Sequence, residues 1–454
     1  MGERKRNPKV IEGLHSTQPE KIPTAGQSHQ DDFITTLSSW CNKVRWFNFT
    51  MLITIPLVAF LQVPWVPMHR KTLVLSIIYY VTTAISVTAG YHRLWAHRSY
   101  SASPTLKWLL AAFGAGAVQG SIKFWVREHR AHHRYTDTDQ DPYNVKKGLL
   151  HAHILWVITK QPRKNNRVDI SDLQNDCVVA LQHRYYFLAA FFMGWGFPTL
   201  VAGLGWNDWY GGFLYAGILR SFFVNQATFC VNSLAHWIGE QPYDDRRSSR
   251  DHLITALITM GEGYHNFHHE FPSDYRNGIE WYQPDITKWA IRLCEQLGLA
   301  YDLKRFRQNE IGKSRLQQVF KKLNVERESL DWGPPLSELP VMEWDEYHDK
   351  VTQGHLLILI GGVVHDVSKF IHEHPGGESM MRLALGKDAT TLFNGAVYLH
   401  SNAANNILAT LRVAILRGGC EVEIFKQQNN SIDMLAKETP VHVQNLPKSI
   451  AGHS

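Results

Sequence analysis

Two pairs of long apolar segments constrain the fold of this sequence more than any other feature. The paired segments are residues 46–64 with 72–90 and residues 185–204 with 209–231. Each has close to the roughly 20 residues that an α-helix needs to cross the hydrocarbon core of a lipid bilayer. The linker within each pair is so short that it allows only a hairpin turn between neighbouring helices. The sequence therefore predicts a helical membrane protein with four transmembrane helices.

The distribution of positive charge predicts the orientation of these helices. Lys and Arg are frequent before the first pair, in residues 92–184 and after residue 240, whereas the linker 205–208 carries none. Cytoplasmic loops of membrane proteins carry an excess of Lys and Arg. We therefore expect both termini and the central loop to face the cytosol, with two short hairpins on the other side.

One shorter apolar run and one charged residue depart from the pattern of these long apolar segments. A further apolar run, residues 108–118, has about 11 residues, too few to span a bilayer, and is expected to be re-entrant or to lie in the interface. Arg220 lies inside the last apolar segment. Because a charged side chain is costly in lipid, we expect it to face protein or water.

Composition narrows the class of protein further. Charged residues make up 19% of the chain and aromatic residues 12%, with 15 Trp, whereas soluble proteins carry roughly 25% charged residues. The net charge is only +6, from 47 Lys and Arg against 41 Asp and Glu, and without a basic stripe it argues against nucleic-acid binding. The five cysteines are scattered without a CxxC pair, which favours a reducing location over a disulfide framework or a thiolate zinc site.

Outside the apolar segments the sequence changes character several times. Residues 1–44 are polar and are expected to form a disordered cytosolic arm, and the basic, amphipathic stretch 274–322 is expected to be helical. Residues 326–340 contain three prolines among charged residues, as linkers do. Residues 341–418 alternate short apolar strands with helical runs and predict a small soluble α+β domain. A polar tail, 419–454, follows it.

Histidine is the most unusual residue type of the chain, with 24 copies, and three clusters stand out: His92 and His97; His129, His132 and His133; His265, His268 and His269. In the last two clusters the spacing i, i+3, i+4 places three imidazoles on one helical face. The first two histidines are five residues apart, which turns the rings away from each other on a regular α-helix, so we expect a helix end between them. His236 follows Asn232 by four residues, which puts this polar pair on one face at the same membrane surface.

Clustered imidazoles at one membrane surface predict a metal centre. Imidazole alone does not select among iron, zinc, copper and nickel. Eight or nine nitrogen ligands are too many for one tetrahedral zinc, which indicates two metal ions. Nearby acids are candidates to orient the rings by accepting their N–H groups, with solvated surface charge as the alternative: Glu128, Asp137, Asp139, Asp141, Glu262 and Glu270.

A second group of histidines lies in the predicted soluble domain. His374 is followed by Pro375, Gly376 and Gly377, and His400 comes 26 residues after His374. The Pro-Gly-Gly turn lets the backbone move away, so that the ring can stand at the wall of a pocket. Two such histidines on opposite walls would hold a haem from both axial sides, an arrangement for electron transfer rather than oxygen binding. An ordinary turn is the alternative interpretation.

These motifs resemble those of known families. Residues 45–325 resemble the membrane acyl-CoA Δ9 desaturases of the stearoyl-CoA type, through the sequences HRLWAH at 92–97, REHRAHH at 127–133, NSLAH at 232–236 and EGYHNFHHEFP at 262–272. Residues 341–418 resemble cytochrome b5. The order of the two domains resembles the fungal form of the enzyme.

The resemblance implies a cofactor set. A cytosolic helical cap is implied to hold two non-haem iron ions through nine histidines and, through water, Asn232. The nine histidines are His92, His97, His129, His132, His133, His236, His265, His268 and His269. The cytochrome b5-like domain is implied to hold haem b through His374 and His400.

The resemblance also implies a reaction, its partners and a location. A cis double bond is introduced between carbons 9 and 10 of a saturated fatty acyl-CoA, stearoyl or palmitoyl, in unsaturated fatty acid biosynthesis. The reaction uses O2 and two electrons, because acid–base groups cannot remove hydrogen from an unactivated methylene. NADH-cytochrome b5 reductase is the implied electron source, and the endoplasmic reticulum membrane is the implied location.

Substrate contacts are implied in the same way. The acyl tunnel is implied to bend beside Gln119, Trp125 and Thr228, with the CoA headgroup near Arg127 and Lys160 and the buried end of the acyl chain near Tyr80 and Ala84. The small Ala84 suggests room for a stearoyl chain as well as a palmitoyl chain. Gly120 departs from the pattern, because animal relatives carry an amide side chain there, near the headgroup.

Three other functions share part of this pattern. A lipid hydroxylase uses the same iron–histidine chemistry but returns oxygen to the substrate. A front-end desaturase carries its cytochrome b5 domain at the N-terminus and a Gln where this chain has His265. A membrane-tethered haem carrier would donate electrons to other proteins and would hold haem iron only, whereas an active desaturase would hold non-haem iron as well.

Overall fold

The computed structural model describes residues 41–161, 168–395 and 399–418. Most of the expected N-terminal arm, up to residue 40, and the tail 419–454 lie outside the described residues. The chain divides into two compact units, Met1–Lys321 and Lys322–Ser454. Each unit has its own hydrophobic core.

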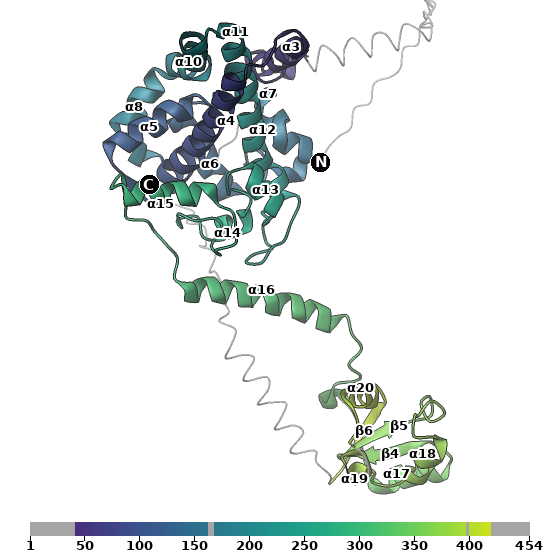
Figure 1. Ribbon diagram of the computed structural model, residues 1–454. Helices are drawn as coiled ribbons and strands as arrows, with labels where there is room; N and C mark the ends of the chain where they lie inside the picture. Colours follow the sequence, from purple (N-terminus) through teal and green to yellow (C-terminus); the bar gives the residue numbers. More distant parts are fainter. Residues whose placement is uncertain (1–40, 162–167, 396–398, 419–454) are drawn as a thin grey trace, which may run out of the picture. The chain divides into compact units, whose positions relative to one another are not determined.

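Four long continuous helices dominate the first unit. In the labels of Figure 1 they comprise α2 (Trp46–Phe49) with α3 (Ile55–Gln62), α4 (Arg70–Ile85), α9 (Tyr186–Phe191) with α10 (Phe197–Trp206), and α11 (Trp209–Gly211) with α12 (Arg220–Asn232). Turns of π-helix continue or join these elements at Thr50–Thr54, Ser86–Ala96, Phe192–Gly196 and Gly212–Leu219, and a 3₁₀ turn, Val63–Trp65, ends the first helix.

Three of these helices are long and apolar enough to cross a membrane: Trp46–Trp65, Arg70–Ala96 and Tyr186–Trp206. The fourth, residues 209–232, is equally continuous, but Arg220, Asn225 and Gln226 lower its mean hydropathy and it falls outside this set. The described residues therefore form a helical membrane unit with three clearly apolar spans.

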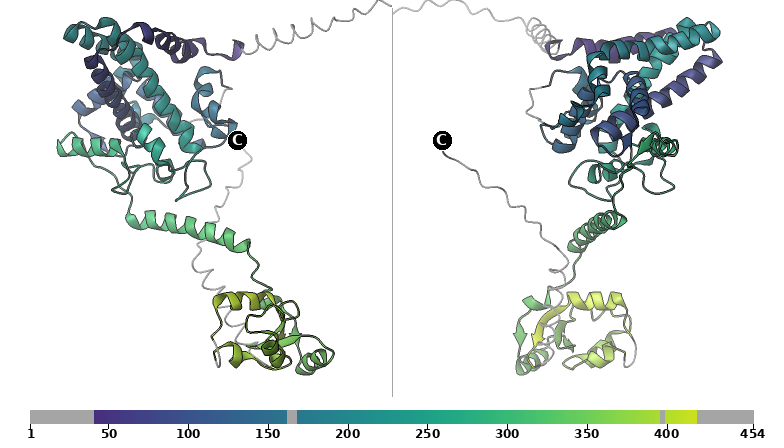
Figure 2. Two further views of the ribbon diagram at one scale, coloured as in Figure 1. Left: turned by 45° about the vertical axis from the view of Figure 1, so that its right-hand side comes forward. Right: turned by 90° about the vertical axis from the view of Figure 1, so that its left-hand side faces the viewer.

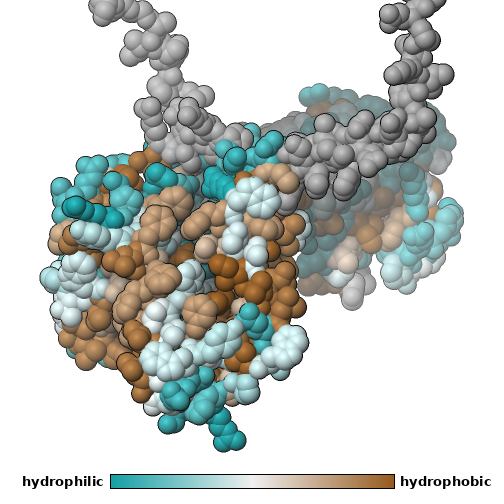
Figure 3. All heavy atoms as spheres, turned by 90° about the horizontal axis from the view of Figure 1, so that it is seen from above, coloured by the Kyte–Doolittle hydropathy of each residue, from teal (hydrophilic) through white to brown (hydrophobic). Residues whose placement is uncertain are grey.

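Many large apolar side chains of these helices point outward. Leu57, Phe187 and Leu188 are each more than half exposed, and brown hydrophobic residues cover much of the face of this unit shown in Figure 3. Contiguous apolar surface of this extent is rare on proteins that face only water. Lipid is the solvent that suits it.

Shorter helices gather around one end of α4 and α12 (Figures 1 and 2). They are α6 (Ile122–Tyr135), α13 (Leu253–Ile258), α14 (His265–Glu270) and α15 (Ile286–Gln296). Ser121 begins α6 by accepting the Phe124 N–H, and Asp285 begins α15 by accepting the Lys288 N–H, as N-cap residues do. This end of the unit carries the histidine clusters.

The remaining elements of the first unit connect these layers. As expected, α5 (Pro104–Ala115) is too short to span a membrane, and it packs against Ser86–Ala96. Strand β1 (Ser101–Ala102) pairs antiparallel with β2 (Ala300–Tyr301). The other short elements are α7 (Trp156–Ile158), α8 (Cys177–Arg184), the π-turn His151–Leu155, and 3₁₀ turns at Val145–Lys147, Ser171–Leu173 and Leu234–His236.

The second unit contains a four-stranded sheet in the order β3-β6-β5-β4, with β3 and β6 parallel and the other pairs antiparallel. Its strands are β3 (Val341–Met342), β4 (Leu357–Ile360), β5 (Val363–Asp366) and β6 (Arg412–Leu416), and its helices are α17 (Trp344–Thr352), α18 (Glu378–Ala384), α19 (Thr390–Phe393) and α20 (Asn402–Thr410). This α+β composition agrees with the expectation from the sequence. The preceding helix, α16 (Gln308–Glu328), extends into the expected linker, which otherwise contains only a 3₁₀ turn, Leu336–Glu338.

Candidate metal centre and haem pocket

The structure brings the nine predicted histidines together in two groups. His92, His97, His129, His133 and His268 form one group, and His132, His236, His265 and His269 form the other. Within each group the candidate ligand atoms lie within 4.8 Å of one another. Since a metal–imidazole bond is about 2.1 Å long, two ligands on opposite sides of one ion are about 4.2 Å apart, so each group has the size of one coordination sphere.

The pairing of His92 with His97 differs from the expected geometry. We expected a helix end between them, but the helix continues to Ala96 and winds as a π-helix from Ser86. The His97 N–H donates to the His92 carbonyl at 3.1 Å, which is the i to i+5 bond of that helix type. The wider winding brings the two rings onto one side, with centroids 4.8 Å apart.

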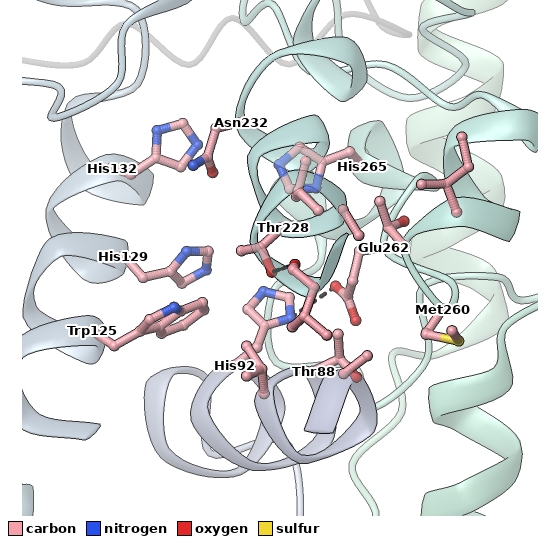
Figure 4. A pocket seen from close by; sticks show the side chains of 17 residues that line it. Thr88, His92, Trp125, His129, His132, Thr228, Asn232, Met260, Glu262 and His265 are labelled. Carbon is pink, nitrogen blue, oxygen red and sulfur yellow. Dashed lines mark hydrogen bonds and ion pairs between the residues drawn. The ribbon is translucent and has the colours of Figure 1, made fainter. Parts of the chain in front are cut away.

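His236 also reaches its group by a different route from the one expected. Helix α12 ends at Asn232, and a 3₁₀ turn, Leu234–His236, carries the ring inward. Its imidazole centroid lies 4.9 Å from that of His132 and 4.8 Å from that of His265. Figure 4 shows Asn232 close to His132, on the side that faces His265. The amide therefore lies beside the four-histidine group.

The chemistry of this donor set fits bound metal ions. Ring nitrogens of neighbouring histidines approach to between 2.8 Å, for His97 and His129, and 3.2 Å, for His132 and His269. Burial lowers the pKa of seven of the imidazoles well below the usual value, and neighbouring charged groups, chiefly the other rings, lower it further: His97, His129, His133, His236, His265, His268 and His269. Metal ions bind the neutral imidazole, so these rings are already in the ligating form.

Two of the six candidate acids contact the rings directly. Glu262 lies 2.8 Å from His92 Nδ1, and Asp141 lies 2.9 Å from His132 Nδ1. Burial alone would raise the pKa of Glu262, but Arg93 and His92 lower it to about 2. An ionised carboxylate on Nδ1 leaves Nε2 as the ligand atom and fixes the ring orientation.

The other four acids do not contact the rings directly. Asp137 is connected to a ring through Ser248: it accepts a hydrogen bond from Ser248, whose hydroxyl lies 2.8 Å from His236 Nδ1. Glu128 pairs with Arg127, Asp139 pairs with Lys147 at the surface, and Glu270 accepts from Ser314.

Sequence reasoning missed the buried ionic network behind His92. Arg93 is 1% exposed and donates to Glu262, to Asp285 and to the Tyr275 carbonyl at 2.7 to 3.2 Å. Asn277 donates to the second oxygen of Glu262 at 2.7 Å. The available signal was the arginine inside the HRLWAH sequence, directly after an apolar segment, where an unpaired charge is costly.

A cavity of about 1000 Å³ reaches the five-histidine group at His129 and is lined mainly by apolar side chains. Gln119, Trp125 and Thr228 line it, as does His129. Gln119 Nε2 donates to Thr228 Oγ1 at 2.8 Å. A smaller space of about 40 Å³ beside the histidines is lined by Ala84, His92, Trp125 and Thr228 (Figure 4). The volume and apolar lining of the larger cavity are those of a ligand pocket.

The other predicted substrate residues have different surroundings. Tyr80 OH donates to the Ile258 carbonyl at 3.3 Å. Arg127 pairs with Glu128 and lies over the Phe124 ring, and the Lys160 N–H donates to the Lys43 carbonyl. Among the described residues that line the large cavity, Phe124 and Glu128 appear but Arg127, Lys160 and Tyr80 do not.

The second unit contains a cavity of about 640 Å³ whose lining includes both His374 and His400. His374 Nδ1 lies 3.3 Å from the Gly377 carbonyl, and His400 Nδ1 lies 2.9 Å from the Phe393 carbonyl. Each contact makes Nδ1 the protonated nitrogen and Nε2 the one with the lone pair. A Cβ on Gly376 would lie 2.8 Å from His374 Cε1, so the glycine is needed for this ring position. The lining and both histidines fit a haem.

Comparison with known proteins bears on both sites. The family described as fatty acid desaturase matches residues 69–305, and the family described as cytochrome b5-like haem/steroid binding domain matches residues 343–417. A probable acyl-CoA desaturase of Schizosaccharomyces pombe is 49% identical over 419 residues, covering 92% of this chain and 87% of the relative.

Two further relatives extend the comparison. Acyl-CoA desaturase 1 of Saccharomyces cerevisiae is 45% identical, covering 94% of this chain and 83% of the relative. The human stearoyl-CoA desaturase is 35% identical over 266 residues, covering 57% of this chain and 74% of the relative. The two fungal proteins are thus similar over both units of this chain, and the human protein over a shorter part.

Proposed function

The chain belongs to the fatty acid desaturase family and carries a cytochrome b5-like domain, and on this premise we propose that it is an acyl-CoA Δ9 desaturase. Its substrate is a saturated fatty acyl-CoA, stearoyl or palmitoyl, and its product carries a cis double bond between carbons 9 and 10. The observation that carries the proposal is the position of nine clustered imidazoles next to a large apolar cavity.

The family uses two non-haem iron ions, and the two histidine groups supply five and four ligands for them. Asn232 adds a contact through water at the four-histidine group. Bound iron supplies the O2-dependent oxidising power that removes two hydrogens from adjacent methylenes. Both groups consist of histidines alone, so no carboxylate is among the proposed iron ligands. Glu262 and Asp141 orient His92 and His132 instead, through contacts to the Nδ1 atoms of these rings.

The apolar cavity positions the acyl chain and excludes water. Gln119 and Thr228 come from different parts of the chain, both line the cavity together with Trp125, and they are joined by their hydrogen bond. A chain that follows this wall presents one pair of carbons to the adjacent histidines. Positioning of this kind is sufficient to select one bond among chemically equal methylenes.

Four further residues are proposed to contact the two ends of the acyl-CoA. Ala84 and Tyr80 lie near the far end of the acyl chain, and Ala84 leaves room for a stearoyl tail. Arg127 and Lys160 bind the CoA phosphates near the mouth of the cavity. Since Arg127 is half exposed beside Glu128, its guanidinium can exchange that surface partner for a phosphate at little cost.

The cytochrome b5-like domain delivers the electrons. His374 and His400 hold haem b in the cavity of the second unit, and NADH-cytochrome b5 reductase reduces it. Carrying this domain on the same chain raises its effective concentration at the di-iron centre, to about the millimolar range for a short flexible connection.

Location and topology follow from the same proposal. The protein crosses the endoplasmic reticulum membrane four times, residues 209–232 forming the fourth span, with both termini and the di-iron centre in the cytosol. The polar residues of the fourth span are buried rather than lipid-facing: Arg220 is 2% exposed and Asn225 is 4% exposed, which permits a membrane helix of lower mean hydropathy.

Expression in a yeast strain without its own Δ9 desaturase tests the proposal. Palmitoleate and oleate, with the double bond located by mass spectrometry, are the expected products. Hydroxylated chains would show a hydroxylase instead. No product from protein that is loaded with haem but holds no non-haem iron would show an electron carrier.

A further inference from the structure

A strained turn between α5 and α6 forms part of the wall of the large cavity. Val118 and Gly120 have positive φ angles of 59° and 98°, and both line the cavity together with Gln119. A β-branched residue in this conformation is a genuine outlier. Such a conformation persists only where the surrounding structure fixes it.

Helix α12 fixes this turn from behind through buried hydrogen bonds. Arg220 Nη1 donates to the Gly116 carbonyl at 2.7 Å, and Asn225 Nδ2 donates to the Ala117 carbonyl at 3.0 Å. These carbonyls directly precede Val118. One residue after Val118, the Gln119 side chain returns to α12 and donates to Thr228. The turn is therefore attached to α12 on both sides of its strained residue.

Arg220 is the most unusual member of this set. It is 2% exposed inside the membrane unit, and no carboxylate among the described residues pairs with it. Its other donors bind the Gly194 carbonyl at 2.6 Å and the Ala216 carbonyl at 3.1 Å, and its Cζ lies 4.6 Å from the Tyr79 ring centroid. A buried cation in a membrane helix is costly and usually serves function.

Arg220 is not among the described residues that line the large cavity. It joins three backbone segments instead: the end of α5, the π-turn Phe192–Gly196 and its own helix. We propose that Arg220 is a positioning residue that sets which carbon pair of the acyl chain is oxidised. This inference rests on the proposed desaturase function.

Arg220 acts on the register between the acyl chain and the histidine groups. Arg220 holds the turn so that Gln119 reaches Thr228, and Thr228 also lines the small space beside His92 and His129. The part of the cavity wall that Gln119 and Thr228 form is thereby kept at a fixed distance from the histidine groups. Because a displacement of about 1 Å changes the rate at a given position by about 100-fold, a relaxed turn would let a neighbouring carbon pair compete.

Two variants disturb the turn by different means. Arg220→Met removes the donors to the Gly116 and Gly194 carbonyls but keeps an unbranched apolar side chain. Gly194→Ala keeps Arg220, but its new Cβ would lie 2.9 Å from Val118 Cγ2 and would push the same turn. Gly205→Ala is the matched control, since its Cβ would meet no atom of the described residues within 4 Å.

The readout is the position of the double bond in fatty acids from the full-length protein, expressed in yeast without its own Δ9 desaturase. Wild type and Gly205→Ala should give one position. Arg220→Met and Gly194→Ala should give a mixture with neighbouring positions, in which the off-position fraction rises at least tenfold. A lowered yield alone would indicate a merely structural role.

The outcomes separate the inference from the function it rests on. If wild type makes no double bond, the desaturase function is wrong. If wild type is active and both variants keep a single position, the inference is wrong while the function stands. Should Arg220→Met bind no non-haem iron, Gly194→Ala alone decides, and a single position in its product overturns the inference.

Discussion

Replacing Glu262 by Gln tests whether a buried carboxylate outside the ligand groups controls the di-iron centre. Glu262 accepts hydrogen bonds from His92, Arg93 and Asn277 at 2.7 to 3.2 Å. Glutamine has nearly the same shape, but its amide nitrogen is a donor and must face one of these donors. The substitution therefore changes charge and hydrogen bonding while it adds no volume.

The structure limits how much this change can cost. Breaking a buried ion pair outright costs about 3–5 kcal/mol, but Arg93 would keep two hydrogen bonds to Asp285 and one to the Tyr275 carbonyl. With the amide nitrogen in place of the oxygen that faces His92, the hydrogen bonds from His92 and Asn277 are lost, while both bonds from Arg93 remain but lose the carboxylate charge. Loss of the bond from His92 costs about 1–3 kcal/mol. If this loss falls on metal binding, iron affinity drops about 10- to 100-fold.

Iron content and turnover should be measured on the purified full-length protein. Non-haem iron is titrated with a metal buffer and expressed per haem, which serves as an internal standard because the cytochrome b5-like domain is unchanged. Asp139→Asn is the matched control: this acid also lies near a histidine motif, but its side chain is 94% exposed and pairs only with Lys147 among the described residues. Wild-type iron affinity in Glu262→Gln would refute the orienting role of Glu262.

Other substitutions test the remaining parts of the protein. Gly376→Ala should lower haem content, seen as haem absorbance per chain, because its Cβ would displace the His374 ring. Ala84→Leu fills the small space beside His92 and should shift the product ratio from oleate toward palmitoleate about tenfold, as gas chromatography would show. Burial, and then Arg412, lower the pKa of His365 to about 4 from 6.5, so the unfolded state takes up the proton first. The stability of the haem domain should be full above about pH 6.5 and fall by about 3 kcal/mol toward pH 4, and His365→Leu should remove this slope in denaturant titrations followed by haem absorbance.

Patterns that are local in the sequence predicted much of this structure. Helix-long apolar runs predicted the long helices to within a few residues at most ends, as in Trp46–Trp65 and Tyr186–Trp206. The i, i+3, i+4 spacing placed His129, His132 and His133 on one helix, α6. In both cases the periodicity of a single helix carries the information, so no distant contact is needed to interpret it.

Features that depend on distant residues escaped prediction. The spacing of His92 and His97 is that of a π-helix, but the sequence alone does not show that the chain winds in this way from Ser86 to Ala96. The Arg93 network joins residues 169 and 192 positions away, Glu262 and Asp285. Which residues pair with Arg93 depends on the tertiary structure and not on residues nearby in sequence. A single sequence therefore shows an arginine next to an apolar segment but not the carboxylates that neutralise it.

One helix, α12, connects the parts that select a carbon pair. It carries Arg220 at its start, Thr228 in the lining of both cavities and Asn232 at its end beside the four-histidine group. At 1.5 Å per residue, Thr228 lies about 6 Å along the axis from Asn232 and about 12 Å from Arg220. The distance from Thr228 to Asn232 is thus set by the regular backbone of the helix, which a side-chain substitution alters little. The attachment of the Gly116–Gly120 turn to α12 depends on three side-chain hydrogen bonds, from Arg220, Asn225 and Gln119, so changes of regiochemistry should arise at that attachment sooner than among the iron ligands.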